Sequence, residues 1–478
     1  MNTLDLILVI PVVAALLQIF VRPYAIAAGI NVLATVLVFG GSISLFFSRP
    51  ETTTYFVLDN LNIYLIALTS FVFMTTSIFS VSYIAHEIEI DRIPPKLSRL
   101  YHVLFQCFSF TMLMALSSNN LGIMWVSVEG ATLASVLLVG LYRTPLAIEA
   151  AWKYFILCGV GLALALFGTT LLYLCAQTVI GTGMDAMTWT ILLTKISTAN
   201  PALLNLAFVF LLIGYGTKIG LFPLHAWLPD AHSAAPAPIS AVLSGLLLNV
   251  AMYVVMRFKM LMNTNPGVIP TGTVMVVFGL MSLFVAGFML YRRTDIKRLF
   301  AFSSIEHMGI ITFAFGVGGV YANFAALLHM AMHSLTKSAL FFTVGRIAQI
   351  EGTQEISKIR GLTTSQPFLG WALVFGTAAI VGLPPSGVFM SEFLVVTSTF
   401  SHQPLLVIPL MLGILLGLGA LISKMQKMAF GPGEEGKEKV GITTVVPVLI
   451  HLTLVLTAGF YLPTFFVGLL QNISKMLG

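Results

Sequence analysis

The sequence predicts an all-α integral membrane protein that forms a single transmembrane domain over residues 1–478. Of the 478 residues, 58% are hydrophobic and only 9% are charged, whereas an ordinary soluble domain has about 25% charged residues. A soluble chain of this length needs a charged surface that this composition cannot supply, which excludes a water-soluble enzyme, a disordered protein and a fibrous repeat. An open sheet edge cannot face lipid, so long apolar runs predict a bundle of helices.

Apolar runs of spanning length recur along the whole chain. A transmembrane helix needs about 20 mainly apolar residues, and connections that carry Pro, Gly or charge separate one run from the next. The connections are too short to hold a soluble domain. We expect about fourteen transmembrane helices, at residues 3–20, 24–47, 58–84, 100–117, 120–141, 150–177, 203–222, 236–258, 272–291, 297–318, 322–345, 369–393, 404–428 and 444–472.

Lysine and arginine are unevenly divided between the two faces that fourteen spans define. Sixteen lie in odd-numbered loops: Arg22, Arg92, Lys96, Arg99, Arg143, Arg292, Arg293, Lys297, Arg298, Arg346, Lys358, Arg360, Lys424, Lys427, Lys437 and Lys439. Five lie on the other face: Arg49, Lys195, Arg257, Lys259 and Lys475. Cytoplasmic loops are enriched in Lys and Arg. We therefore expect a bacterial or archaeal cytoplasmic membrane, odd loops inside and both termini on the external (periplasmic) face. The net charge of +6 then reflects these loops, not nucleic-acid binding.

A few ionisable residues lie inside the predicted spans. A charge within the bilayer is costly, so each is a functional hypothesis. The candidates are Glu129 in the fifth span, Glu149 and Lys153 in the sixth, Lys218 in the seventh, His329, His333 and Lys337 in the eleventh, and Glu392 in the twelfth.

Proton movement is the chemistry that suits these residues. The charge state of a buried Glu or Lys responds to burial and to nearby charge, so a Glu–Lys pair can hold or release a proton. Histidine titrates near neutral pH without help. The residues His329, His333 and Lys337 are four apart and form a stripe about 12 Å long on one helix. We expect these residues, with water between them, to relay protons.

Each candidate also has a structural interpretation. The pair Glu149 and Lys153 has the spacing of an ordinary helix-surface ion pair. The spacing of His329 and His333 also suits a metal site or two core histidines, but no further ligands lie nearby in sequence. Three residues at the end of the seventh span form either a proton entry mouth or a capped turn: His225, Asp230 and His232.

The remaining histidines and cysteines carry no functional signal. We expect four histidines at loops or rims: His86, His102, His402 and His451. The three cysteines lie in apolar runs without CxxC spacing: Cys107, Cys158 and Cys175. This spacing indicates no disulfide framework and no zinc or iron–sulfur cluster. We expect no metal and no cofactor.

Two spans are interrupted by glycine and proline. The seventh contains residues 220–223 and the twelfth contains residues 382–385, each near an ionisable residue. Proline inside a span frees backbone groups, and interrupted spans at matching places in two halves indicate an inverted repeat. We expect broken helices 7 and 12 within two inverted five-helix repeats. Helices 4–8 (residues 100–258) and helices 9–13 (residues 272–428) would each form a half-channel.

Long motifs resemble a known superfamily. The stretch Lys218-Ile-Gly-Leu-Phe-Pro-Leu-His-Ala-Trp-Leu-Pro-Asp-Ala-His is very similar to the signature of the antiporter-like subunits of respiratory complex I. The later stretches Asp295-Ile-Lys-Arg-Leu-Phe and His329-x-x-x-His333-x-x-x-Lys337 follow in the expected order. The superfamily also includes Mrp-type sodium/proton antiporter subunits and membrane subunits of energy-converting hydrogenases. The resemblance covers nearly the whole chain.

The resemblance implies roles for particular residues. Glu129 matches the channel glutamate of the fifth helix, Lys218 the lysine of the broken seventh, and Lys153 a basic residue of the sixth. Glu392 matches the acidic version of the terminal residue in the twelfth helix. Asn249 departs from the pattern, because many members have Lys or His there and an amide cannot carry a proton by changing charge. The half-channels would then connect through water or the histidines of the eleventh helix.

The sequence around Ser303-Ser-Ile-Glu306-His307-Met-Gly looks most like the hydrogenase-4 component F type. We count Glu306 and His307 as candidates for linking the two half-channels. The resemblance implies a proton-translocating subunit of a group 4, formate hydrogenlyase-like hydrogenase or a related assembly. Its partners would be other membrane subunits and soluble hydrogenase-like or other energy-coupling subunits. The chain has no flavin, nickel or iron–sulfur motif, so we expect a translocase subunit without an autonomous active site.

Two alternatives remain open at this point. One is a Mrp-type cation/proton antiporter subunit, which would move sodium as well as protons. The other is a proton-coupled membrane subunit of an inorganic carbon uptake complex.

Overall fold

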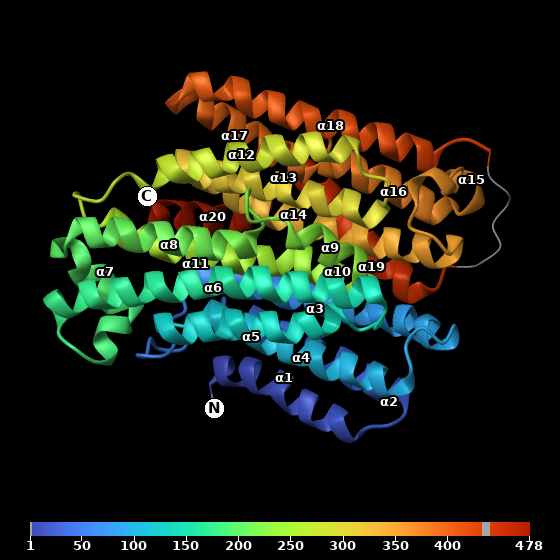
Figure 1. The fold of residues 1–478 in the computed structure, drawn as a ribbon, viewed down its shortest axis with the longest axis horizontal. Helices are drawn as coiled ribbons and strands as arrows, with labels where there is room; N and C mark the ends of the chain where they lie inside the picture. Colours follow the sequence, from blue (N-terminus) through green and yellow to red (C-terminus); the bar gives the residue numbers. More distant parts are fainter. Residues whose placement is uncertain (1, 433–439) are drawn as a thin grey trace.

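The computed structural model describes residues 2–432 and 440–478, and helices make up nearly all of it. The helices lie side by side along one direction, with α1 and α2 on one flank and α17 and α18 on the other (Figure 1). The first half contains α1 (Thr3–Phe20), α2 (Tyr24–Ser44), α3 (Asn60–Glu89), α4 (Pro95–Ser117), α5 (Leu121–Val139), α6 (Pro145–Ile180), η1 (Met184–Met187), α7 (Trp189–Lys195), η2 (Ile196–Thr198), α8 (Pro201–Ile219), α9 (Trp227–Ala234) and α10 (Ala237–Val242).

A five-residue π turn, η3 (Leu243–Leu247), joins α10 to the second half without interrupting the helix. The second half contains α11 (Leu248–Asn263), α12 (Thr271–Tyr291), α13 (Ile296–Val317), α14 (Gly319–Glu351), η4 (Ile356–Lys358), α15 (Leu362–Ser365), α16 (Pro367–Ile380), α17 (Gly387–His402), η5 (Pro404–Leu406), α18 (Val407–Ala429), α19 (Ile442–Phe460) and α20 (Thr464–Leu477).

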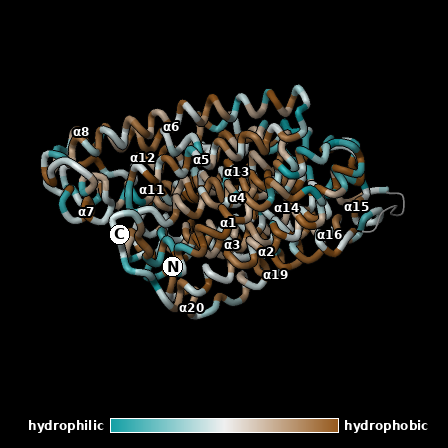
Figure 2. Tube along the Cα trace, turned by 90° about the horizontal axis from the view of Figure 1, so that it is seen from below, coloured by the Kyte–Doolittle hydropathy of each residue, from teal (hydrophilic) through white to brown (hydrophobic). Residues whose placement is uncertain are grey.

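The helices have the length and composition of a multi-pass membrane protein. In the described part of the chain, twelve helices are long and apolar enough to span a membrane. Hydrophobic segments fill the middle of the bundle and hydrophilic segments gather at its two ends (Figure 2). This arrangement confirms the predicted all-α membrane fold. Two predicted spans are not among these twelve. The eleventh is α14, which is rich in polar residues, and the twelfth is divided into α16 and α17. The count of fourteen therefore stays a prediction.

The structure contains both expected breaks. Helix α8 ends at Gly220, which has the left-handed φ of +82° that glycine adopts without steric cost. Helix α16 ends before Gly382, with a φ of +70°, and α17 starts at Gly387. Each break also contains a cis X-Pro bond, Phe222–Pro223 and Pro384–Pro385. The inverted relation of the two halves stays a prediction.

One expected span was drawn wrongly. The run at 444–472 is two helices, α19 and α20, because the chain leaves helical geometry between them and Pro463 precedes the first residue of α20. A proline nitrogen has no hydrogen to continue the α19 ladder. The connection at 178–202 likewise contains short helices, η1, α7 and η2.

Several residues assigned to loops are in fact buried. Arg257, Lys259 and Lys297 expose 4% or less of their surface and bond to atoms inside the bundle. His102 and His451, expected at rims, are also buried in α4 and α19. Both histidines sit on apolar helices, so their neighbours and not their spacing decide their burial. Lys437 and Lys439 lie outside the described residues.

Both termini lie toward the end of the bundle that carries α7, and α15 lies at the other end (Figures 1 and 2). The amide of Asn323, near the start of α14, donates to the carbonyl of Gly478 at 2.7 Å and ties down the C-terminal residue. Two termini at one end are what an even number of spans produces. Which end faces the cytoplasm stays a prediction.

Candidate functional site: a buried polar line

Lys218 lies in the last turn of α8 and its side chain is fully buried. Its Nζ donates a hydrogen bond to the Tyr154 hydroxyl at 2.7 Å, and that hydroxyl also bonds to the Ser135 hydroxyl at 2.7 Å. The Nζ atom lies 4.4 Å from the ring centroid of Tyr154 and 5.6 Å from that of Trp227. A hydroxyl and two aromatic faces therefore stabilise this ammonium, and no carboxylate of the described chain is in contact with it.

Small residues bring α6 and α8 close enough for this contact. An added Cβ at Gly214 of α8 would lie 2.6 Å from the backbone nitrogen of Ala165 of α6. An added Cβ at Gly161 of α6 would lie 2.7 Å from the Thr217 side chain. Glycines at such crossings let helix backbones approach closely in membranes. The close crossing sets Tyr154 of α6 beside Lys218.

Glu129 of α5 is half-buried and interacts electrostatically with Lys218. Glu129 and Lys218 do not form an ion pair within 4.0 Å in the described structure. The Oε2 atom of Glu129 is buried without a hydrogen-bond partner in the described chain. An acidic and a basic group thus lie within electrostatic range of each other without direct contact, an arrangement that water or a mobile proton can bridge.

Helix α9 links Lys218 to the second half of the molecule. Trp227, at its first residue, covers Lys218 and bonds through Nε1 to the Thr217 carbonyl at 2.8 Å. His232, near its end, is fully buried against the ring of Phe341. It also lies within electrostatic range of Lys337. In the described chain, neither ring nitrogen of His232 has a hydrogen-bond partner.

Asn249 of α11 lies at the contact between α11 and α14. Its Nδ2 donates to the Ser334 hydroxyl at 2.7 Å, and that hydroxyl donates to the Gly245 carbonyl in the π turn at 2.6 Å. The Oδ1 atom is buried and has no partner among described atoms. The amide therefore offers an acceptor to water between the two halves.

Lys337 of α14 and Glu306 of α13 form the next part of the line. The Nζ of Lys337 donates to the Phe300 carbonyl at 2.9 Å, and its charge interacts with that of Glu306. Glu306 exposes 3% of its surface. An added Cβ at Gly417 of α18 would collide with the Glu306 carboxylate. The missing side chain at Gly417 thus provides the space that this carboxylate occupies.

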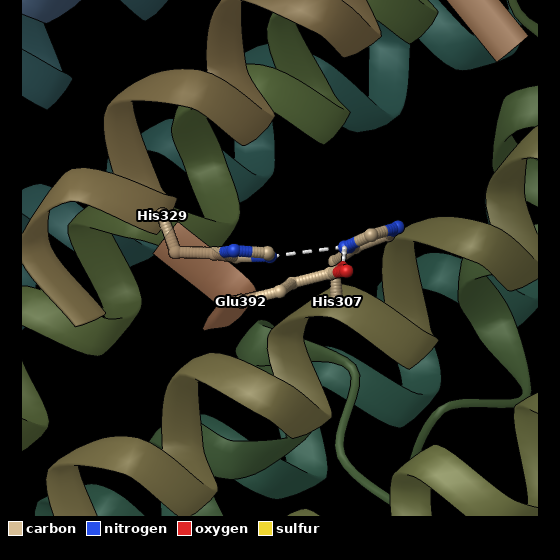
Figure 3. A group of neighbouring side chains, drawn as sticks. All are labelled: His307, His329 and Glu392. Carbon is tan, nitrogen blue, oxygen red and sulfur yellow. Dashed lines mark hydrogen bonds and ion pairs between the residues drawn. The ribbon is translucent and has the colours of Figure 1, made fainter. Parts of the chain in front are cut away.

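His307, His329 and Glu392 form the histidine–glutamate group, which Figure 3 shows converging from three helices. The Nδ1 of His307 lies 2.9 Å from the Nε2 of His329 and 3.8 Å from a carboxylate oxygen of Glu392. All three residues are buried. Their ligand atoms lie within 4.8 Å of one another.

The hydrogen bonds around this group assign the positions of its protons. The Ser391 hydroxyl donates to the Val388 carbonyl at 2.8 Å, so it accepts from the Nδ1 of His329 at 2.8 Å. The Ile380 carbonyl lies close to the His307 ring. Because Nδ1 of that ring faces His329, we assign Nε2 as the donor. Both facing nitrogens then present lone pairs, and a cation between them resolves the repulsion.

His333 completes the stripe on α14. It lies one turn after His329, and its ring centroid is 5.6 Å from that of His307. The side chain is fully buried, and within the described chain neither ring nitrogen has a hydrogen-bond partner. Buried polar atoms are normally bonded, so this ring is placed to bond water or a proton carrier.

The structure thus places most of the predicted residues inside the bundle, in two groups that α9 connects. We define the central line as Glu129, Lys218, His232, Lys337, Glu306, His333, the His307–His329 pair and Glu392. Asn249 lies beside it.

Three other predicted residues lie apart from the line, in a group near the start of α6 that we call the entry cluster. Lys153 pairs with Glu149 at 2.6 Å and with Asp230 at 3.0 Å, and Arg298 pairs with Asp230 at 2.7 Å. Nearly half of the Lys153 side chain is exposed, at 48%. The cluster lines an open cavity of about 680 Å³. His225 lies in the break after α8, half-buried, between two phenylalanine rings.

Sequence reasoning missed a second buried cluster where α3 meets α11. Arg257 is buried, pairs with Asp59 at 2.7 Å and donates to Asn62 at 2.5 Å. Asp59 also caps α3, and its side chain accepts from the Asn62 backbone. Burial opposes ionisation of Asp59, but the Arg257 charge and the hydrogen bonds from Arg257 and from the Asn62 and Leu61 backbone together outweigh it and hold the Asp59 pKa below its usual value. The Asp-x-x-Asn capping pattern was the available signal.

Tyr154 and Glu87 were also missed. Tyr154 gave no charge signal, although it holds Lys218. Glu87 of α3 is fully buried, accepts from the Gln349 amide at 2.6 Å and lies 3.9 Å from Arg92. It lies near the end of α3, where the apolar pattern hides its burial.

Comparisons with known proteins agree with this architecture. The family described as "NADH:quinone oxidoreductase/Mrp antiporter, TM" matches residues 118–417. The chain is 52% identical to the hydrogenase-4 component F homolog of Methylacidiphilum infernorum (isolate V4), over 98% of this chain and 99% of the relative. It is 27% identical to a Na(+)/H(+) antiporter subunit of Alkalihalophilus pseudofirmus, over 76% and 73% of the two chains. A chain of the membrane-bound sulfane sulfur reductase, an archaeal respiratory membrane complex, has a TM-score of 0.87 at 21% identity and covers 99% of this chain and 97% of its own length.

Proposed function

The chain belongs to the transmembrane family of NADH:quinone oxidoreductase and Mrp antiporter subunits, and we propose that it moves protons through the membrane along the central line. The line contains both acidic and basic groups. Among the described residues, no carboxylate contacts the ammonium of Lys218 or Lys337, while Glu129 and Glu306 lie within electrostatic range. A change in the separation of such charges changes which group holds the proton.

The observation that carries this proposal is the burial of charges that are not paired for stability. A buried charge without a contacting counter-ion costs several kcal/mol, on the order of 3–5, and a scaffold protein gains nothing from that cost. Ionisable groups inside a membrane protein commonly mark ion and proton pathways. Lys218 of α8, Lys337 of α14 and Glu306 of α13 are each buried, and α9 lies between the first of them and the other two.

The route of the proton follows the contacts. From the entry cluster, water leads toward Lys218 and Glu129, and α9 carries His232 toward Lys337. Glu306 and the histidines then deliver the proton to Glu392 in the second break. Asn249 holds water between the halves and does not change its own charge.

The energy would come from partner subunits. We propose that this chain assembles with other membrane subunits and with a soluble hydrogenase-like subunit of the group 4, formate hydrogenlyase-like type, in a bacterial or archaeal cytoplasmic membrane. Its similarity to a hydrogenase-4 component F homolog over nearly the full length of both chains supports this assembly. Purification of the native complex tests it. A co-purified nickel-containing subunit supports the proposal, and a soluble inorganic-carbon-capturing partner overturns it.

Two variants test the proton path itself. The native complex with Lys218→Met or Glu129→Gln, reconstituted in liposomes, should keep electron transfer to an artificial acceptor and lose proton translocation. Lys358 is exposed and pairs with Glu355 outside the bundle core. The control variant Lys358→Met should therefore leave electron transfer and proton translocation unchanged. Undiminished proton translocation in both line variants would refute the path.

A second candidate function is cation/proton exchange without a redox partner. The similarity to the Na(+)/H(+) antiporter protein of Alkalihalophilus pseudofirmus favours it. It predicts sodium-driven proton movement in liposomes that contain no electron donor. The leading proposal predicts no proton movement until a donor is added.

A further inference from the structure

We propose that His307, His329 and Glu392 bind one divalent transition-metal ion of the Zn²⁺ class, which displaces the proton and blocks the central line. The inhibitory consequence rests on the proposed function, whereas the binding itself rests on geometry alone. The three residues come from α13, α14 and α17 and are separated by 22 and 63 positions in the sequence. Spacing along one helix therefore cannot reveal them.

The distances fit a metal centre. One ligand atom from each residue lies within 4.8 Å of the others, and all three side chains are buried. Two imidazoles and one carboxylate, with an open fourth position, are a recurrent protein ligand set for Zn²⁺. Tetrahedral bonds of about 2.0–2.1 Å to nitrogen separate two nitrogens by roughly 3.4 Å. The facing nitrogens are 2.9 Å apart, so small rotations of the rings admit the ion.

The surrounding hydrogen bonds orient the ligands before any ion arrives. Ser391 accepts from Nδ1 of His329, and the Ile380 carbonyl lies close to the His307 ring. Protein metal sites use the same arrangement, in which the second ring nitrogen donates to an oxygen and fixes the tautomer. Two lone pairs and one carboxylate oxygen consequently point at one position.

Nearby space can supply the fourth ligand. The ring of His333 lies 5.6 Å from that of His307 and, within the described chain, bonds to nothing through either nitrogen. Water on His333, or the ring itself after rotation, would complete four-coordination. Imidazole-rich sites favour Zn²⁺, Ni²⁺ and Cu²⁺ over Mg²⁺ and Ca²⁺, which prefer oxygen ligands.

The glycine at the second break shapes the carboxylate side of the site. An added Cβ at Gly382 would overlap a carboxylate oxygen of Glu392. The absence of that Cβ lets the carboxylate lie against the break and face His307. A chelating position is thus built by backbone as well as by side chains.

Metal binding to the purified native complex tests the proposal without any transport measurement. Zn²⁺ content after dialysis, and the visible absorption of bound Co²⁺, should show one tetrahedral site in the wild type. His307→Asn, His329→Asn and Glu392→Gln should each remove that absorption and lower bound metal by one equivalent. His402→Asn, an exposed histidine on α17, should keep both.

The outcomes separate this proposal from the proposed function. A wild-type complex without the site, or three variants that bind metal as the wild type does, would overturn the metal proposal. If the variants fail to assemble, X-ray absorption spectroscopy of Zn²⁺ bound to the wild-type complex takes their place. Fewer than two imidazole nitrogen ligands in that spectrum would also overturn the metal proposal. Metal binding that persists while Lys218→Met and Glu129→Gln both translocate protons normally would instead refute the proton path alone.

Discussion

Replacing Gly382 by alanine should lower proton translocation by about two orders of magnitude while the complex stays folded. An added Cβ would overlap one carboxylate oxygen of Glu392 and would lie 3.0 Å from its Cδ. The obstacle is the free end of a flexible side chain, so the carboxylate turns away and the helices keep their places. The other carboxylate oxygen, Oε1, is 3.8 Å from Nδ1 of His307 in the native arrangement and turns with the same carboxylate. A displacement of about 1 Å in a reacting group can cost about 100-fold in rate.

The backbone effect of this substitution has a matched control. Alanine at a left-handed position costs roughly 1–2 kcal/mol, and Gly382 has a φ of +70°. Gly352 has a φ of +65°, and an added Cβ there meets nothing within 4 Å. Gly352→Ala therefore has the same backbone cost without moving Glu392, and its proton translocation should stay within about twofold of the wild type.

The assay is proton uptake by the reconstituted complex, normalised to electron transfer and to the amount of assembled complex. Adding Glu392→Asp to Gly382→Ala should recover part of the loss, because the shorter side chain withdraws from the new methyl group. Equal translocation by Gly382→Ala and Gly352→Ala would refute the role of the Glu392 position.

Three further perturbations have definite expectations. Asp59→Asn should destabilise the protein by about 3 kcal/mol, because it leaves Arg257 buried without its counter-ion, and a thermal unfolding series in detergent measures this loss. Because the pKa of Asp59 is lowered in the folded protein, Asp59 contributes its full stabilisation above the unfolded pKa near 4, and this stabilisation is lost as the pH falls through the lower folded pKa. Asp59→Asn should therefore lack this loss of stability at acid pH. A dependence of stability on pH that equals that of the wild type would contradict the assignment. Tyr154→Phe should slow translocation roughly 10- to 100-fold, since a hydrogen bond to a charged group contributes about 1.5–3 kcal/mol, and wild-type rates would show that Lys218 does not need this hydroxyl. Asn249→Leu should reduce translocation and Asn249→Ser should largely keep it, because only serine retains a group that bonds water; equal rates in the two would remove Asn249 from the path.

The sequence was sufficient for the features that depend on composition and local pattern. Apolar runs predicted the helices, and Gly-Pro pairs predicted both breaks. The family resemblance that Lys218 and its following motif indicated is confirmed by the matching family and by the relative at 52% identity.

Features that depend on helix packing could not be read in advance. Tyr154 lies 64 positions before Lys218, and only the close crossing of α6 and α8 joins them. Arg257 looked like a loop residue at the end of a span, yet an extra turn of helix buries it against Asp59. His451 bonds to Thr75 of α3 at 2.8 Å, a contact that no spacing within α19 indicates.

The entry cluster also shows that spacing within one helix does not reveal contacts with other helices. The spacing of Glu149 and Lys153 allowed both a surface pair and a pathway role. The structure has the surface pair, together with a contact to Asp230. That third partner belongs to α9, which only the break after α8 brings to this position.

The most direct test of the central line compares two buried lysines. Lys337 and Lys259 are each buried, and each donates to a backbone carbonyl of α13, at Phe300 and Phe315 respectively. Lys337→Met and Lys259→Met therefore remove the same kind of interaction, but only Lys337 belongs to the line. In the reconstituted native complex, the number of protons translocated per electron transferred should fall in Lys337→Met and stay at the wild-type value in Lys259→Met. An unchanged ratio in Lys337→Met, or an equal fall in both, would contradict proton transfer along the central line.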